Sequence, residues 1–425
     1  MLIILYFLLF LFFIFIGTPI GFAMILASLV YAFYNHINII MIALRFSDPM
    51  GSFTLLAVPA FVFVGVFLTE TGFTDRIFKF AEDLVGHVPG GLGHANVLAS
   101  MIFAGMSGDS TADAGGLGAI EVVTMKKAGY DENFATAITA ASSGIGPIIP
   151  PSIDFVIYGF LAEVSVARLF IAGFIPGVIM GLSLMALIYI RVKSGKIRAP
   201  ILKKASFQDL KKSFKEALPA LFAPILLIGG ILSGIFTPTE AGSICVFYSI
   251  VLSLIYKTFS FKKLTISLER SLRITVISML LISGGCIFNW FLITGGLLDK
   301  IVNLFVIIKN PYLVLLVFNL IILFMGCFMS ITATIVLMTP ILVSISGIFG
   351  FNLVHMGVVL VLNLMIGINT PPYAPALFVT CEVAGTSFEK SLKELLPFLI
   401  PLIVTLVIIT YIPGLVMFLP NLLFK

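Results

Sequence analysis

Long stretches of uninterrupted hydrophobic residues recur along the chain, with few polar positions inside them. The clearest cover residues 2–16, 218–235, 277–293, 312–328 and 394–412. As helices, these stretches are long enough, or nearly so, to cross about 30 Å of hydrocarbon. The strands of a membrane barrel would alternate apolar and polar side chains, and these stretches do not. The pattern predicts an all-α polytopic membrane protein.

The first hydrophobic stretch reads MLIILYFLLFLFFIFIGTPIG. It has no basic residues before its apolar run and no small-residue cleavage site, which a signal peptide would carry. We therefore expect an uncleaved first span.

Composition agrees with a membrane protein and argues against an enzyme. Of the 425 residues, 60% are hydrophobic and only 11% are charged, whereas soluble domains carry about 25% charged residues. The four cysteines contain no close pair and the four histidines form no ligand cluster, so neither a disulfide nor a bound transition metal is predicted. No motif of a known membrane enzyme is present, and we expect no enzymatic activity.

Positive charge is concentrated in two segments. Nine basic residues lie between Arg191 and Lys215 beside a single acid, Asp209, and five more lie within residues 257–273. Short loops rich in lysine and arginine stay in the cytoplasm. About 40 residues separate the two segments, which is enough for two spans, so both can face the cytoplasm. Topology explains this charge, and no nucleic-acid binding is expected.

The chain contains an internal repeat. GPIIPP (146–151) matches GINTPP (367–372) at an offset of 221 residues, and Gly105 and Gly326 keep the same offset. Several collinear matches at nearly constant spacing indicate a duplication. We expect a first repeat over 1–192, a basic cytoplasmic linker over 193–216 and a second repeat over 217–425.

The two repeats are expected to be inverted in the membrane. The turn at 125–133 carries Lys126 and Lys127, while its counterpart at 346–354 carries no charge. A loop that is basic in one copy and neutral in the other indicates opposite sides of the membrane. Inverted repeats are typical of secondary transporters whose discontinuous helices meet near the midplane.

Each repeat contains two interruptions of its apolar pattern. A polar tip between short apolar segments predicts re-entrant hairpins at about 95–125 and 318–348, and the Pro-Pro stretches predict broken helices at about 133–160 and 354–380. Non-helical backbone at membrane depth persists only where it is buried or lines an aqueous cavity. Its carbonyls, with serine, threonine and asparagine oxygens, would suit a small cation such as Na⁺. This predicts two related cation sites with the substrate between them. The alternative is that the small residues only permit close helix packing and the prolines only kink helices.

The motifs SGDSTADAGGLGAIEVVTMKKAGYDENFATAITAASSGIGPIIPPSIDFVIYG, FTPTEAGSI and NLMIGINTPPYAPALF resemble the large membrane subunit of the tripartite ATP-independent periplasmic (TRAP) transporters. The resemblance runs over essentially the whole chain. It implies a Na⁺-coupled elevator-type transporter in the bacterial inner membrane, with hairpins and broken helices forming the mobile domain. It also implies a small four-helix membrane subunit and a periplasmic binding protein as partners, and a small organic acid as the substrate.

The resemblance also assigns site residues. The first Na⁺ site would use Ser107, Ser110, Ser143, Gly144 and Pro147. The second would use Ser330, Thr332, Gly367, Asn369 and Thr370. The residues expected to face the substrate are Asp109, Thr111, Pro151, Asp154 and Tyr373.

Three positions depart from the family's usual pattern. Asp109 stands where the first hairpin normally has serine, Asp154 where an uncharged residue is usual, and Ser330 where an acid is common. A carboxylate inside a membrane is costly and usually marks an ion or substrate path. If Asp109 and Asp154 face the cavity, the substrate would carry hydroxyl or amino groups, or the aspartates would bind a cation.

The aspartates also have simpler explanations. Asp109 and Asp113 could cap the second limb of the hairpin, where negative charge is favoured near a helix N-terminus. Asp154 could face water near the surface. Glu240, in FTPTEAGS, is assigned to a helix start or the scaffold.

Two other functions stay open at this point. One is a stand-alone Na⁺-coupled transporter of the same inverted-repeat class, which would need neither partner. The other is an ion channel, which would not require paired hairpins that meet broken helices.

Overall fold

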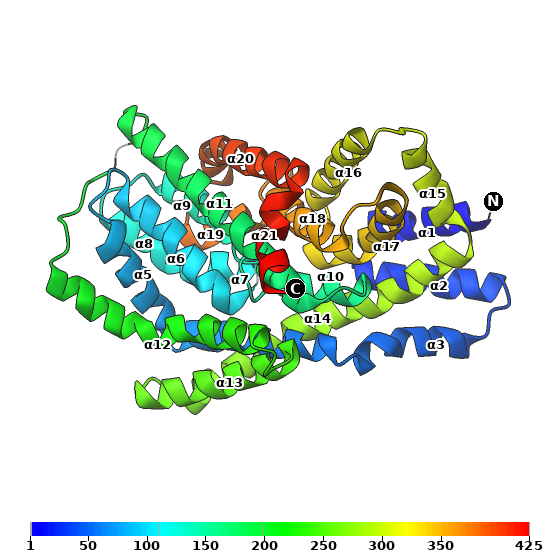
Figure 1. Ribbon diagram of the computed structural model, residues 1–425, viewed down its shortest axis with the longest axis horizontal. Coiled ribbons are helices and arrows are strands. Elements are labelled where there is room, and N and C mark those ends of the chain that lie inside the picture. Colours follow the sequence, from blue (N-terminus) through cyan, green and yellow to red (C-terminus); the bar gives the residue numbers. More distant parts are fainter. Residues whose placement is uncertain (1, 109, 198, 425) are drawn as a thin grey trace.

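The computed structural model describes residues 2–108, 110–197 and 199–424, and the regular structure within them is helical (Figure 1). The chain begins with α1 (Leu2–Phe15), α2 (Ile20–Tyr34), α3 (Ile39–Ser47), two 3-10 turns (Asp48–Gly51 and Thr54–Leu56), α4 (Ala57–Glu70) and α5 (Phe73–Val85). The predicted all-α fold class is confirmed.

The first predicted hairpin and broken helix correspond to short helices separated by irregular segments. These helices and the long one after them are α6 (Gly91–Ser107), α7 (Ser110–Gly115), α8 (Leu117–Lys127), α9 (Glu132–Ser143), α10 (Ile153–Leu161) and α11 (Val166–Lys193). The helical pattern is therefore interrupted at the polar tip and again at residues 144–152, where the glycines and prolines lie.

The second half of the chain begins with three long helices. After them come mostly shorter helices, again interrupted at a tip and at a Pro-Pro stretch. The elements of this half are α12 (Phe207–Leu232), α13 (Pro238–Ile255), α14 (Phe261–Thr294), α15 (Leu297–Val306), α16 (Pro311–Gly326), α17 (Ile331–Phe349), α18 (Leu353–Gly367), α19 (Pro375–Ala384), α20 (Phe388–Tyr411) and α21 (Pro413–Leu423). Here the breaks fall at 327–330 and 368–374. The inverted relation of the two halves stays a prediction.

Six helices among the described residues are long and apolar enough to cross a membrane: α11, α12, α13, α14, α17 and α20. A seventh span is counted if residues 39–51 and 54–70, bent by 56° between them, act as one. The predicted windows 218–235, 277–293 and 394–412 fall mainly in three of these helices. The windows 2–16 and 312–328 coincide with α1 and α16, whose helices have only 14 and 16 residues.

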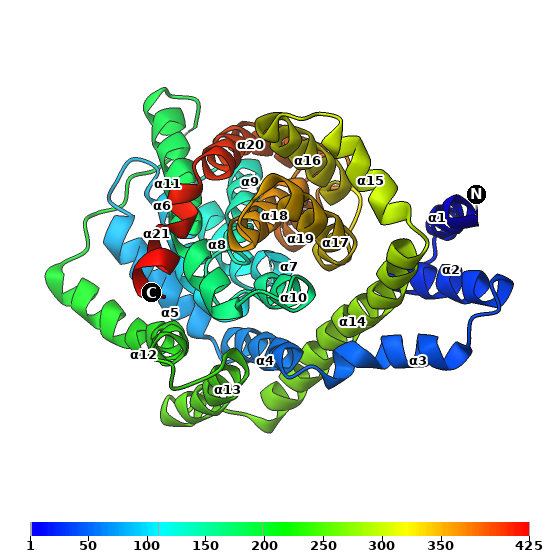
Figure 2. The same ribbon diagram turned by 45° about the vertical axis from the view of Figure 1, so that its right-hand side comes forward.

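Helix α18 lies at the centre of the molecule. Every residue from Val354 to Gly367 is buried, as expected for a helix that is apolar on all sides. It packs against α11, α16, α17 and α20. Figure 2 shows α9, α10, α17 and α19 around it, with α14 running past this group along one side. Helix α14 itself packs against α2, α4 and α17.

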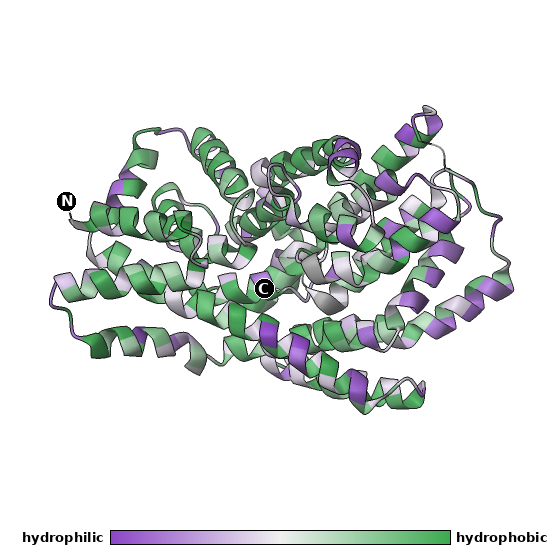
Figure 3. Cartoon of the chain, turned by 180° about the vertical axis from the view of Figure 1, so that it is seen from behind, coloured by the Kyte–Doolittle hydropathy of each residue, from purple (hydrophilic) through white to green (hydrophobic). Residues whose placement is uncertain are grey.

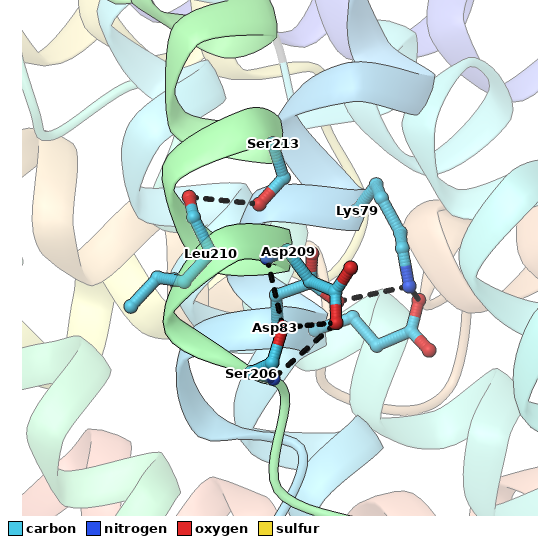
Figure 4. Close-up of polar contacts among 7 residues, drawn as sticks. Lys79, Asp83, Ser206, Asp209, Leu210 and Ser213 are labelled. Carbon is cyan, nitrogen blue, oxygen red and sulfur yellow. Dashed lines mark hydrogen bonds and ion pairs between the residues drawn. The ribbon is translucent and has the colours of Figure 1, made fainter.

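The part of the predicted basic linker over residues 207–216 belongs to α12. A capping box starts this helix: the backbone N–H of Asp209 donates to Ser206 Oγ at 3.1 Å, and the Ser206 N–H donates to Asp209 Oδ2 at 3.3 Å (Figure 4). Such reciprocal bonds satisfy N–H groups that a helix start leaves free. Figure 3 shows hydrophilic residues concentrated toward this end of α12 and hydrophobic residues along the middle of most helices.

The two basic segments both approach helix α5. Lys79 of α5 lines a cavity with Lys203 and Asp209 of the first segment. One turn earlier on α5, the Arg76 guanidinium lies 4.2 Å from the ring centroid of Tyr256, which adjoins the second segment. The segments therefore lie near the same helix, in agreement with the expectation that both face the cytoplasm.

The assignment of Glu240 to a helix start is confirmed. Thr237 and Glu240 form a capping box at the beginning of α13, in which the Thr237 N–H donates to Glu240 Oε2 at 2.8 Å.

Candidate functional site

A hairpin tip lies against the broken stretch of the same half in both halves of the chain. In the first half, Gly108 has a left-handed φ of 61°, and a Cβ there would lie 2.8 Å from the carbonyl oxygen of Pro151. In the second half, a Cβ on Gly367 would lie 2.8 Å from the Cα of Gly326. Glycine is needed at these positions because two backbones come into direct contact.

Both tips, the second broken stretch and the start of α10, where the first broken helix resumes, contribute to one cavity of about 500 Å³. Its polar lining residues are Ser110, Asp154, Ser278, Ser330, Thr332 and Tyr373. A volume of this size is typical of sites for small organic ligands, which combine apolar walls with a few polar groups. Five of these six residues were predicted from the sequence as ion or substrate ligands, and the structure brings them together.

Asp154 is held at this cavity by the restart of the broken helix. The hydroxyl of Ser152 caps α10 by accepting a hydrogen bond from the N–H of Phe155 at 3.2 Å, which places Asp154 in the first helical turn. Asp154 is only 6% exposed and lines the cavity. The alternative that it faces water at the surface is therefore wrong. A helix N-terminus favours a carboxylate at this position.

The serines assigned to the first cation site differ in whether their hydroxyl groups are already hydrogen-bonded. Ser110 is fully buried, and its Oγ has no hydrogen-bond partner among the described residues. The Ser143 hydroxyl, in contrast, donates to the carbonyl oxygen of Ala140 at 2.9 Å. Gly144 and Pro147 are buried in the unwound stretch behind the cavity, as is Pro151 of the predicted substrate set. Asp109 and the side chains of Ser107 and Thr111 lie outside the described residues.

The second set lies partly at the cavity and partly behind it. Ser330 is exposed and caps α17 by accepting a hydrogen bond from the Ala333 N–H at 3.4 Å. Thr370 donates its hydroxyl proton to the Ile366 carbonyl at 2.7 Å. Asn369 is fully buried, and its Oδ1 has no hydrogen-bond partner among the described residues. Asn369 and Ser110 are thus the predicted ligands with an unused buried oxygen.

The two predicted ligand sets meet inside the molecule. A Cβ on Gly144 would lie 3.4 Å from Nδ2 of Asn369. The sequence assigned these two residues to different sites, but the structure places them side by side.

A buried polar network behind the first hairpin was not predicted. The Asn96 amide donates to Thr139 Oγ1 at 2.6 Å, and Ser142 donates to Asn96 Oδ1 at 2.7 Å. Thr139 is also hydrogen-bonded to the carboxyl of Glu121, which is 1% exposed. The sequence feature that could have indicated this network is Glu121, an acid inside a mostly apolar helical segment.

Asp113 connects this network to the unwound stretch. It interacts electrostatically with Glu121 and is 2% exposed. Its carboxylate occupies the space that a Cβ on Gly146 would need. Asp113 lies in the first turn of α7, where a carboxylate suits the helix dipole.

Replacing Thr139 with valine is expected to lower the free energy of unfolding by about 1–3 kcal/mol, because it removes a hydrogen-bond partner from two buried polar groups. Chemical unfolding of the purified protein in detergent measures this. Thr265→Val is the control, because Thr265 is exposed and its hydroxyl donates to the Phe261 carbonyl of its own helix. Equal stability of Thr139→Val and the wild type would show that the network does not stabilise the fold.

Helix α14 also contributes to the cavity, which the sequence did not indicate. Ile274, Ile277, Ser278 and Leu281 line it. Their spacing of three or four residues places them on one helix face. That face is apolar like its surroundings, so only Ser278 distinguishes it in the sequence.

Comparison with known proteins shows a whole-chain similarity. A family model described as the DctM component of the tripartite ATP-independent periplasmic transporters matches residues 7–415. The sialic acid TRAP transporter permease protein SiaT of Haemophilus influenzae is 43% identical over 413 residues, which cover 96% of this chain and 67% of that protein. The sialic acid TRAP transporter large permease protein SiaM of Vibrio cholerae is 40% identical over 412 residues, covering 96% of each.

Two weaker similarities are also to transport proteins. The C4-dicarboxylate TRAP transporter large permease protein DctM of Pseudomonas aeruginosa is 36% identical over 382 residues, covering 89% of each chain. Among solved structures, the YdaH transporter of Alcanivorax borkumensis has a TM-score of 0.56 at 14% identity, covering 85% of this chain and 86% of that one. This last similarity concerns the fold alone.

Proposed function

Because this chain belongs to the DctM component family of the tripartite ATP-independent periplasmic transporters, and is a large permease of the bacterial inner membrane rather than an enzyme, we propose that it imports a hydroxyl-rich sugar acid of the sialic acid type together with Na⁺. The observation that carries this proposal is the cavity lined by both hairpin tips, by the start of α10 in the first broken helix and by the second broken stretch. Import would follow an elevator mechanism, in which hairpins and broken helices move together past α14.

The proposed Na⁺ coupling draws on the polar groups around the cavity. Na⁺ is a hard cation that prefers oxygen ligands. In transporters, the carbonyl groups of unwound backbone coordinate such ions. Ser110 Oγ and Asn369 Oδ1 are buried oxygens without a hydrogen-bond partner among the described residues. Burying a polar atom without a partner is unfavourable, and a cation bound at each predicted site would supply that partner.

The proposed substrate class draws on Asp154 and on the relatives. Asp154 would repel a simple dicarboxylate but would accept hydrogen bonds from hydroxyl or amino groups. SiaT and SiaM, at 43% and 40% identity, carry sialic acid in their names. Sialic acid combines one carboxylate with several hydroxyl groups, so it suits a cavity with an acid at one position.

The proposed partners are a small four-helix membrane subunit and a periplasmic substrate-binding protein. The family description calls the transporter tripartite, and this chain would supply one of its three parts. The binding protein would deliver the sugar acid to the periplasmic face.

Replacing Ser110 with alanine is expected to raise the Na⁺ concentration needed for half-maximal uptake by roughly three- to tenfold, because it removes one oxygen ligand without changing the fold. Uptake by the reconstituted complex at increasing Na⁺ concentrations measures this. Ser346→Ala is the matched control, because Ser346 Oγ is also buried without a partner among the described residues but does not line the cavity. The same shift in both variants, or in neither, would contradict a Na⁺-binding role for Ser110.

A further inference from the structure

A second cavity, of about 360 Å³, lies between α4, the end of the first hairpin tip and α14. Its charged lining residues in the described part of the chain are Glu70, Arg270 and Arg273. Ile274 lines both this cavity and the larger one that contains Asp154. The two cavities are therefore adjacent along α14.

One face of α14 joins the two cavities. The residues on this face follow one another at intervals of one or three positions, and they are Arg270, Arg273, Ile274, Ile277, Ser278 and Leu281. Residues three and four apart in a helix lie on the same side. The first hairpin forms the opposite wall, with Gly108 and Ser110 at the larger cavity and Gly115 and Gly116 at the smaller one.

The two arginines in the second cavity differ in their ion pairs. Arg270 forms an ion pair with Glu70. Arg273 forms an ion pair with Glu269 of its own helix, at 3.7 Å, and the two side chains are 75% and 71% exposed. Pairs this open contribute little to stability. Glu269 does not line the cavity, so its described lining carries two guanidinium groups and the one carboxylate of Glu70, an excess of one positive charge.

The charged end of α14 belongs to the second basic segment, which the positive-inside rule assigns to the cytoplasm. On this assignment, the small cavity lies on the cytoplasmic side of the larger one and would form its mouth. A positively charged mouth with low-dielectric walls attracts anions and raises their local concentration.

We propose that Arg273 binds the carboxylate of the transported acid at this mouth, between its release from the Asp154 cavity and its escape to the cytoplasm. This inference rests on the proposed function. The same guanidinium chemistry would also suit a phospholipid phosphate, so the test distinguishes a substrate carboxylate from a lipid headgroup. The geometry favours the substrate, because Arg273 lines a cavity that adjoins the transport site.

The test uses the complete transporter in inside-out membrane vesicles, with radiolabelled sialic acid as the probe on the cytoplasmic side. Arg273→Gln is expected to raise the apparent KM for cytoplasmic substrate about two- to fivefold, as expected for the loss of an exposed charge contact. Arg273→Lys should keep most of the affinity. The KM for binding-protein-dependent uptake from the periplasmic side should stay unchanged in both variants.

Lys262→Gln is the control, because Lys262 is an exposed cation of the same basic segment outside both cavities. An unchanged cytoplasmic KM in Arg273→Gln, or an equal change in Lys262→Gln, would overturn the inference. So would an effect that disappears in proteoliposomes of neutral lipids, because Arg273 would then bind lipid. Absence of transport by the wild type would instead contradict the proposed function.

Discussion

Replacing Gly367 with alanine is expected to reduce Na⁺-driven uptake at least about tenfold. The added Cβ would lie 2.8 Å from the Cα and 3.0 Å from the carbonyl carbon of Gly326. Both neighbours are backbone atoms, so the clash cannot be relieved by a side-chain rotation, and overpacking of this kind costs about 1–3 kcal/mol. It would force apart the ends of α16 and α18, where the second hairpin tip meets its broken stretch. Uptake by proteoliposomes and the melting temperature in detergent measure the effect.

Gly347→Ala is the matched control for this prediction. Gly347 lies in α17, and a Cβ there would meet no atom within 4 Å. The control should transport like the wild type. If Gly367→Ala also transports normally, close contact between the second tip and its broken stretch is not required for transport.

Changing Asp154 to asparagine is expected to raise the KM for the sugar acid, or the Na⁺ requirement, at least about tenfold. The substitution keeps the shape of the side chain but removes the charge from a residue that is 6% exposed and lines the main cavity. Hydrogen bonds to a charged group are worth about 1.5–3 kcal/mol, which corresponds to a tenfold change or more. Kinetics at varied substrate and at varied Na⁺ separate the two roles.

Glu163→Gln controls for the loss of one negative charge near α10. Glu163 is exposed and lies just beyond the C-terminal end of this helix. It should leave both KM and Na⁺ dependence unchanged. Wild-type kinetics in Asp154→Asn would show that Asp154 contacts neither the substrate nor a coupling ion.

Local sequence predicts where the helices of this protein break. Prolines have no N–H for the helix ladder, so the glycines and prolines between Gly144 and Ser152 are enough to identify that break. The same holds for capping: Thr237 and Glu240, three residues apart before an apolar run, marked the start of α13. The similar box at Ser206 and Asp209 starts α12 inside the predicted basic linker, and this helix start was not predicted.

Contacts between distant segments could not be predicted in this way. Nothing in the sequence places Asn369 beside Gly144, because they are 225 residues apart and were assigned to separate sites. Likewise, Glu121 could be noticed as a buried acid, but its connection to Asn96 through Thr139 depends on how α6, α8 and α9 pack. The contribution of α14 to the cavity also depends on tertiary packing, since its lining face is mostly apolar.

The central claim is that the cavity between the two hairpin tips and the two broken stretches couples Na⁺ entry to import of a sugar acid. The most direct measurement is uptake of radiolabelled sialic acid into proteoliposomes that contain this chain with its small membrane subunit. It compares an inward Na⁺ gradient with equal Na⁺ on both sides, each with and without the periplasmic binding protein. We predict accumulation only when the gradient and the binding protein are both present. Uptake that is the same in all four conditions would contradict this account.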